Sequence, residues 1–240
     1  LIKSEKNIKH SVNIHERCGK DIEFFEFPQW FIKILEFKDE LLKLGEKITW
    51  YPSFMKARYK NWVENLQWDW CISRQRFYGI PFPVWYCATC DQPVLADIKD
   101  LPVDPQETKY SDRTCQNCQS MELSADTDVM DTWNTSSLTP QICNHLFSPE
   151  NDVFDTKTAK QFIPMAYRPQ AHDIIRTWAF YTIVKSWMHF KTIPWNEIAI
   201  SGHVTNPKRE KISKSKENSP LSPQNLLKQY PADVIRFWTA

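Results

Sequence analysis

Residues Thr205–Lys216 read T-N-P-K-R-E-K-I-S-K-S-K, and this stretch carries more information than any other part of the chain. It holds five cationic residues and one acid, contains a proline and lacks apolar periodicity, so it predicts a mobile loop rather than a helix. Lysine ammoniums and serine hydroxyls in such a loop suit a polyphosphate, whose charge they stabilise and whose oxygens accept their hydrogen bonds. On charge alone, a solvated surface loop is the commoner explanation.

The segments on either side of this loop indicate an α/β fold. Glu197–Ser201 is a compact apolar strand that ends at Gly202, and Ser222-Pro223 starts a helix with a cap and a proline in its first turn. Upstream, Ile163–Ile193 gives a short apolar stretch, a polar turn and a long helix. This alternation is typical of a parallel sheet whose ligands lie at the carboxyl ends of its strands, and the basic loop follows such an end.

Shorter elements are expected nearer the start of the chain. Leu1–Phe27 contains β-rich stretches, of which Ile22–Phe27 is the clearest predicted strand. Apolar residues recur at helical spacing over Ile34–Leu44, and Gly45 is the expected helix stop. Pro52–Leu66 predicts a second, amphipathic helix.

Length and charge narrow the class of protein. The 240 residues are enough for one or two domains, and the net charge is only +1. The charge is unevenly spread, because the first 20 residues and the basic loop are cationic whereas Asp97–Asp131 is acidic, so one face could meet nucleic acid. No apolar run suits a membrane span or a signal peptide, and we expect a cytoplasmic protein. The chain starts without methionine and stops within an apolar segment, so we expect a piece of a longer protein.

Cysteine spacing predicts a metal site. Cys87-x2-Cys90 and Cys115-x2-Cys118 are two pairs separated by 24 residues, and four thiolates can close a tetrahedral shell around zinc. With all four positions filled by protein, the metal would be structural, within a turn-rich segment at about Pro81–Ala125. A redox role for the pairs and four incidental thiols are the weaker alternatives.

The loop also resembles a known motif. Lys211-Ile212-Ser213-Lys214-Ser215 is similar to the K-M-S-K-S motif of class I aminoacyl-tRNA synthetases, with Ile212 where methionine is usual. Further segments extend the resemblance over practically the whole chain: His15–Gly19, Pro28–Phe31, Asn61–Leu66, Trp70–Gln75, Asp131–Leu138 and Arg168–Trp178. The last two segments resemble the valine-specific members of that family most closely.

The resemblance implies a fold and a layout. The expected fold is α/β, the second half of a class I Rossmann-type parallel-sheet catalytic domain with a small zinc-bearing insertion. Residues 1–30 would be the exit of an editing insertion, 31–80 a helical connective segment, 81–125 the zinc insertion and 126–240 the catalytic half with the K-M-S-K-S-like loop. No H-x-G-H motif, editing-domain body or anticodon-binding region is found in the sequence. The chain alone is therefore expected to be inactive.

The resemblance also implies roles for individual residues. Such enzymes activate an amino acid with ATP and pass it to tRNA, so the substrates would be valine, ATP with Mg²⁺, and tRNA(Val), and the enzyme is expected to be monomeric. Lys211 and Lys214 would stabilise the leaving pyrophosphate, and Trp133 and Ile174 would line the valine pocket. The implied ATP-binding residues are Asp173, Gly202, His203, Ile212 and Ser213.

Several alternatives stay open. The chain could belong to an isoleucine-specific enzyme, or be a non-catalytic zinc-bearing RNA-binding module derived from a synthetase. Without the motifs, Trp133 would be a core tryptophan and Asp173 a helix cap. Arg74 and Arg76 could contact tRNA or be solvated. Ala171 and Glu217 replace glycines usual in the family, which implies a shifted turn or a strained backbone at Ala171.

Overall fold

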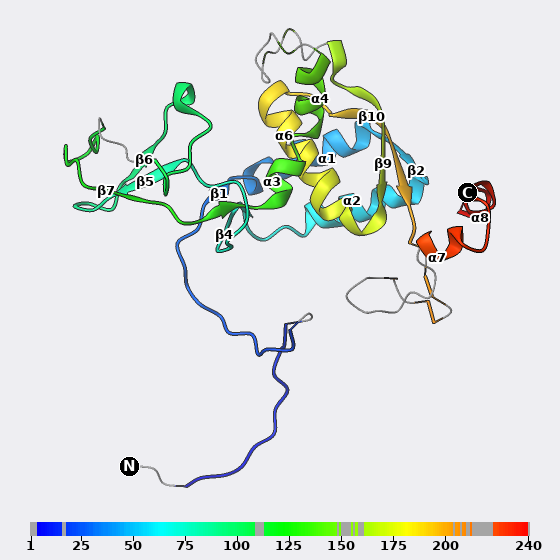
Figure 1. Cartoon of the computed structure of the whole chain (residues 1–240), viewed down its shortest axis with the longest axis horizontal. Coiled ribbons are helices and arrows are strands. Elements are labelled where there is room, and N and C mark those ends of the chain that lie inside the picture. Colours follow the sequence, from blue (N-terminus) through cyan, green and yellow to red (C-terminus); the bar gives the residue numbers. More distant parts are fainter. Residues whose placement is uncertain are drawn as a thin grey trace. The chain divides into compact units, whose positions relative to one another are not determined.

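The computed structural model describes residues 4–15, 18–108, 113–147, 149, 155, 157, 161–203, 205–206, 208–209, 212 and 223–239. Its contacts divide the chain into two compact units. One unit is Gln29–Ser201, and the other combines Leu1–Pro28 with Gly202–Ala240. Figure 1 traces both units from the amino to the carboxyl end.

The larger unit is built on a three-stranded parallel sheet with the order β2-β10-β9. Its strands are β2 (Thr49–Tyr51), β9 (Met165–Ala171) and β10 (Trp195–Ser201). The register pairs Ser201 with Ala171, so β9 and β10 end at the same edge. The predicted strand before Gly202 and the parallel α/β class are thereby confirmed.

Helices pack on this sheet around the main hydrophobic core. They are α1 (Lys38–Lys47), α2 (Lys56–Glu64) and α6 (Phe180–Phe190), with 3₁₀ turns at Leu35–Phe37 and Ser53–Met55. Figure 1 shows α1, α2 and α6 beside the strands β2, β9 and β10. Tyr59 and Val63 of α2 and Phe180 and Ile183 of α6 are almost fully buried in this core. The amphipathic helix predicted at Pro52–Leu66 is therefore confirmed.

Gly45 has a different role from the predicted one. α1 continues past it to Lys47, so the expectation of a helix stop at Gly45 is wrong. A Cβ at Gly45 would lie 2.2 Å from the Tyr59 ring, whose hydroxyl donates a 2.8 Å hydrogen bond to the carbonyl oxygen of Leu41. The glycine is needed because the Tyr59 ring packs directly against the α1 backbone.

Among the described residues, the larger unit also contains short antiparallel sheets and two further helices. The two-stranded pairs are β1 (Phe31–Ile32) with β3 (Trp70–Cys71) and β4 (Ser73–Arg74) with β8 (Val129–Met130). A separate three-stranded sheet consists of β5 (Val84–Cys87), β6 (Pro93–Leu95) and β7 (Leu123–Ala125), with a 3₁₀ turn at Ile98–Asp100. The helices are α3 (Thr132–Ser136) and α4 (Thr139–Phe147).

An irregular turn joins β9 to α6. A 3₁₀ turn at His172–Ile174 is followed by a π-helical turn at Ile175–Ala179, which runs directly into α6. Ala171 precedes the turn with φ −83° and ψ 158°, which is extended backbone that any residue adopts. Backbone strain at Ala171, one of the two expected consequences of replacing glycine, is therefore not found.

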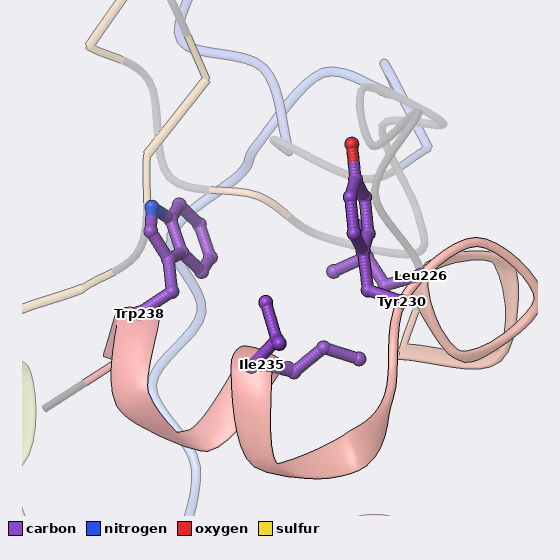
Figure 2. A pocket seen from close by; sticks show the side chains of 5 residues that line it. Leu226, Tyr230, Ile235 and Trp238 are labelled. Carbon is purple, nitrogen blue, oxygen red and sulfur yellow. The ribbon is translucent and has the colours of Figure 1, made fainter.

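The smaller unit has little regular structure among its described residues. Ile22–Phe27 forms no strand, so that prediction is wrong, and Phe24 and Phe25 are 94% and 80% exposed. The helix expected from Pro223 is confirmed as α7 (Pro223–Leu227), which is followed by α8 (Ala232–Thr239). Figure 2 shows Leu226, Tyr230, Ile235 and Trp238 around a shallow apolar cleft of about 340 Å³ between these helices.

Candidate functional site

The carboxyl end of β9 carries two of the predicted site residues. Asp173 and Ile174 lie in the 3₁₀ turn directly after this strand, Asp173 exposed and Ile174 half-buried. Ligands of parallel α/β sheets bind at this edge, because the strand ends there leave loops and helix starts facing solvent. Asp173 thus lies where a ligand could reach its carboxylate.

α3 brings Trp133 near this turn. The Trp178 indole N–H, in the π-helical turn, donates a 2.9 Å hydrogen bond to the carbonyl oxygen of Ser136 at the end of α3. Trp178 also contacts β9, because the guanidinium of Arg168 in that strand lies 3.2 Å from the centre of the Trp178 ring. Trp133 itself is half-buried and packs against the main core. Contacts through Trp178 therefore connect β9, the turns that follow it and α3. Ile174 lies in the 3₁₀ turn of this connected structure, and Trp133 lies in α3.

An ion pair fixes the start of α3. Asp131 precedes the helix and is 4% exposed, and its carboxylate lies 3.3 Å from Nη2 of Arg74. Nη1 of Arg74 donates to the carbonyl oxygens of Cys71 and Ser73 at 3.1 and 2.7 Å. Arg74 therefore has a structural role at the start of α3 and is not merely solvated, whereas a contact between Arg74 and tRNA stays a prediction.

The basic loop is only partly described. Gly202 and His203 follow directly after β10, and Ile212 is half-buried, all in the smaller unit. Lys211, Ser213, Lys214 and Glu217 lie outside the described residues. The roles predicted for them stay predictions.

The four predicted metal ligands come together. The sulfur atoms of Cys87, Cys90, Cys115 and Cys118 all lie within 4.8 Å of one another. Two of the distances are 3.4 Å, from Cys87 to Cys118, and 3.5 Å, from Cys90 to Cys115. A tetrahedral zinc–thiolate shell with bonds of about 2.3 Å separates its sulfurs by about 3.8 Å. The cluster fits that shell.

Both cysteine pairs have the same backbone geometry. The N–H of Cys87 donates to the carbonyl oxygen of Gln92, and the N–H of Asp91 donates to that of Cys87, at 3.0 and 2.9 Å. The second turn repeats this, since Cys115 donates to Ser120 and Gln119 donates to Cys115, both at 2.9 Å. Asp91 and Gln119 occupy the same position and both have positive φ, 56° and 61°. Each turn is a self-contained unit that points two sulfurs the same way.

The electrostatics of the cluster favour a bound cation. Burial raises the pKa of the Cys87 thiol, but the N–H of Thr89 and the Cys118 thiol outweigh it and lower that pKa to about 6. The N–H of Ser120 lowers the pKa of Cys118, but the sulfurs of Cys87 and Cys90 outweigh it and raise that pKa to about 12. Thiols this close cannot all ionise unless a cation shares their charge.

A polar network ties the cysteine-bearing sheet to the body. The Trp30 indole N–H lies within hydrogen-bonding distance of the Tyr86 hydroxyl, at 3.0 Å, and of the Asp126 carboxylate, at 3.3 Å. The Gln75 amide donates to the Asp128 carboxylate at 2.7 Å. Tyr86 lies in β5 and both aspartates follow β7, so the network joins these two strands to the segments around β1 and β4.

Comparisons with known proteins decide the family. The family model of the class I tRNA synthetases (I, L, M and V) matches residues 3–240. The chain belongs to the class I tRNA synthetases. As a member of that family it resembles the valine–tRNA ligase of Picrophilus torridus, with 50% identity over 240 residues, and that of Rickettsia rickettsii (strain Sheila Smith), with 47% over 243 residues. It is covered fully in both comparisons, but spans only 29% of the length of each relative.

Solved structures of other synthetases share the fold. Methionyl-tRNA synthetase of Mycobacterium tuberculosis in complex with methionyl-adenylate aligns with a TM-score of 0.57, at 18% identity, over 95% of this chain and 36% of that one. The agnB2 LeuRS of Agrobacterium radiobacter K84, in a ternary complex with tRNA and LeuAMS, aligns with a TM-score of 0.56, at 21% identity, over 70% of this chain and 23% of that one. The class I catalytic fold is thus confirmed by structure as well as by sequence.

Membrane association has no support in the helices. Across the described parts of this synthetase chain, no helix combines the length and the apolar character that crossing a membrane requires.

Proposed function

We propose that this chain is the second half of the catalytic domain of a valine–tRNA ligase, which activates valine with ATP and transfers it to tRNA(Val). The main support is the identity of 45–50% to valine–tRNA ligases over the whole chain. Trp133 and Ile174 on the connected structure at the end of β9 suit a small apolar side chain. The enzyme would act in the cytoplasm as a monomer.

The reaction needs positioning and charge stabilisation more than covalent chemistry. The valine carboxylate attacks the α-phosphate of ATP in line, and pyrophosphate leaves. Mg²⁺ bound to the phosphates would add positive charge there. Lys211 and Lys214 would stabilise the charge of the leaving group. Asp173 would accept hydrogen bonds from the ribose hydroxyls, and the remaining nucleotide contacts would come from Gly202, His203, Ile212 and Ser213.

The four cysteines would hold a structural zinc ion. Their sulfur spacing and the lowered pKa of Cys87 support this assignment. With four protein ligands the ion has no open position for substrate. It would stabilise the β5-β6-β7 sheet, whose own core is small and includes Trp85, Cys87, Val94 and Cys115.

Amino acid-dependent exchange between pyrophosphate and ATP tests the function. In the full-length protein, valine should support exchange with a higher kcat/KM than isoleucine or threonine. Trp133→Phe should lower kcat/KM for valine while leaving the melting temperature close to that of the unmodified protein. If isoleucine were the better substrate, the chain would belong to an isoleucine–tRNA ligase instead; exchange with neither would favour a non-catalytic RNA-binding module.

A further inference from the structure

A cleft beside Asp173 contains two arginines that the proposed reaction does not use. It measures about 450 Å³ and lies between α2 and the turn after β9, and the described residues that line it all belong to the larger unit. Among the described residues, its lining contains two arginines and one acid: Arg58, Asn61, Trp62, His172, Asp173, Ile175 and Arg176. The volume is in the range of small-ligand sites.

The two arginines come from elements far apart in the sequence. Arg58, Asn61 and Trp62 share one face of α2, because residues three and four positions apart are neighbours on a helix. Arg176 lies opposite them in the π-helical turn, next to the almost fully buried Ile175. The fold therefore brings two positive charges to one cleft, at the edge of the sheet where ligands bind.

Arg176 lies over an aromatic ring of the cleft. Its guanidinium lies 5.6 Å from the centre of the Trp62 ring, within the range of a cation–π contact, and Trp62 contacts Phe180 of the core edge-to-face at 6.3 Å. A cation–π contact uses no N–H group of the guanidinium as a hydrogen-bond donor, so these groups stay available to an anion. Neither Arg58 nor Arg176 forms an ion pair with another described residue. Two unneutralised guanidiniums in one cleft favour a bound anion with several oxygens.

We propose that Arg58 and Arg176 bind a phosphate attached to a ribose, with the ribose toward Asp173. The inference rests on the proposed function, in which Asp173 contacts ribose hydroxyls. Two substrates of that reaction carry this group, ATP and the 3′ end of tRNA. Planar guanidiniums suit phosphate because two N–H groups can donate to two of its oxygens.

Direct binding to the full-length protein tests the proposal with two probes, ATP and a short RNA ending in C-C-A. Arg58→Gln and Arg176→Gln should each weaken the binding of the same probe by about tenfold or more, the scale of one lost charged hydrogen bond. ATP as the affected probe would identify the nucleotide substrate as the ligand, and the RNA would identify the tRNA end. Both arginines are exposed, so both variants should keep the melting temperature of the unmodified protein.

Lys60→Gln is the matched control. Lys60 lies on the same helix, is exposed and is not part of the cleft lining, so its loss removes the same charge without touching the site. The proposal is wrong if neither probe binds more weakly in the arginine variants, or if Lys60→Gln weakens binding equally. Because binding is measured without valine, a protein that lacks valine-dependent exchange would still give a clear result for the cleft.

Discussion

At the scale of single residues, the Arg74–Asp131 pair shows how the start of α3, the helix that carries Trp133, is held. Asp131 is nearly inaccessible to solvent, and Arg74 is the cation that pairs with it at the start of α3. A buried carboxylate is costly without such a partner, so the pair fixes the helix that carries Trp133. The sequence offers both residues but gives no signal that they meet, because β4 and β8 pair only in the folded chain.

Replacing Arg74 should therefore cost stability. Arg74→Gln leaves the Asp131 carboxylate without its cation, and we expect a loss of about 1–3 kcal/mol in the free energy of unfolding. Urea denaturation would measure it. Arg76→Gln, at an exposed position two residues on, should change stability by less than about 0.5 kcal/mol. Adding Asp131→Asn to Arg74→Gln should restore part of the loss; no recovery would mean that the pair is not coupled.

Lys185 leads to a prediction of how the stability of the protein depends on pH. Burial lowers its pKa from the ordinary 10.5 to about 8, and its ammonium lies 5.7 Å from the centre of the Trp70 ring. Between these two pKa values the unfolded chain holds more protons than the folded one, so stability should rise as the pH increases from about 8 to 10.

Lys185→Met should remove that dependence. We expect it to raise the free energy of unfolding at pH 7 by about 1–3 kcal/mol, since folding then no longer removes part of the water around a charged ammonium. Lys60→Met, at an exposed position, should keep the pH profile of the unmodified protein. Denaturation curves at several pH values would decide, and an unchanged profile in Lys185→Met would show that another group titrates.

At the scale of secondary structure, local patterns predicted several of the elements that pack on a neighbour. The α2 helix, β10 and α7 follow from their own spacing and caps. Ile22–Phe27 shows the limit, because its strand-like alternation has no paired strand among the described residues. Gly45 shows another limit, since its role depends on the Tyr59 ring from a different helix.

The β5-β6-β7 sheet should depend on the zinc ion proposed for its four cysteines. We expect about one zinc ion per chain by elemental analysis, and loss of hydrogen-exchange protection confined to this sheet when a chelator removes it. Cys115→Ser should abolish tight binding because it removes an almost fully buried ligand. Cys143→Ser, outside the cluster, should keep the metal. Melting of the whole protein on chelation would contradict a role limited to this sheet.

At the scale of the whole molecule, sequence motifs identified the family correctly because they extend over practically all of the chain. They could not predict how the cleft of Arg58 and Arg176 forms, since it needs α2 and the turn after β9 to meet in space. The residues of the basic loop were assigned by resemblance alone, and the two lysines proposed to stabilise the leaving group lie outside the described residues. The roles of these lysines therefore have to be tested by measuring activity.

That test is a lysine substitution in the full-length protein. Lys214→Ala should lower the rate of adenylate formation by about 10²–10³-fold, the usual effect of removing one group that stabilises charge in the transition state. The affinity for valine should stay nearly unchanged. Residues 1–240 alone should form no adenylate. Rapid adenylate formation by this piece, or an unaffected rate in Lys214→Ala, would place the chemistry on other residues.

The repeated hydrogen-bond pattern of the two cysteine turns also bears on how freely this region can change in length. Each turn closes on itself within six residues, so neither relies on the connector between them to direct its sulfurs. Doubling the length of a flexible loop costs only about 0.6 kcal/mol in closure entropy. A segment inserted after the exposed Thr108 should therefore be tolerated without loss of metal. The segment between the two cysteine turns is therefore a suitable position for inserting a reporter domain into this protein.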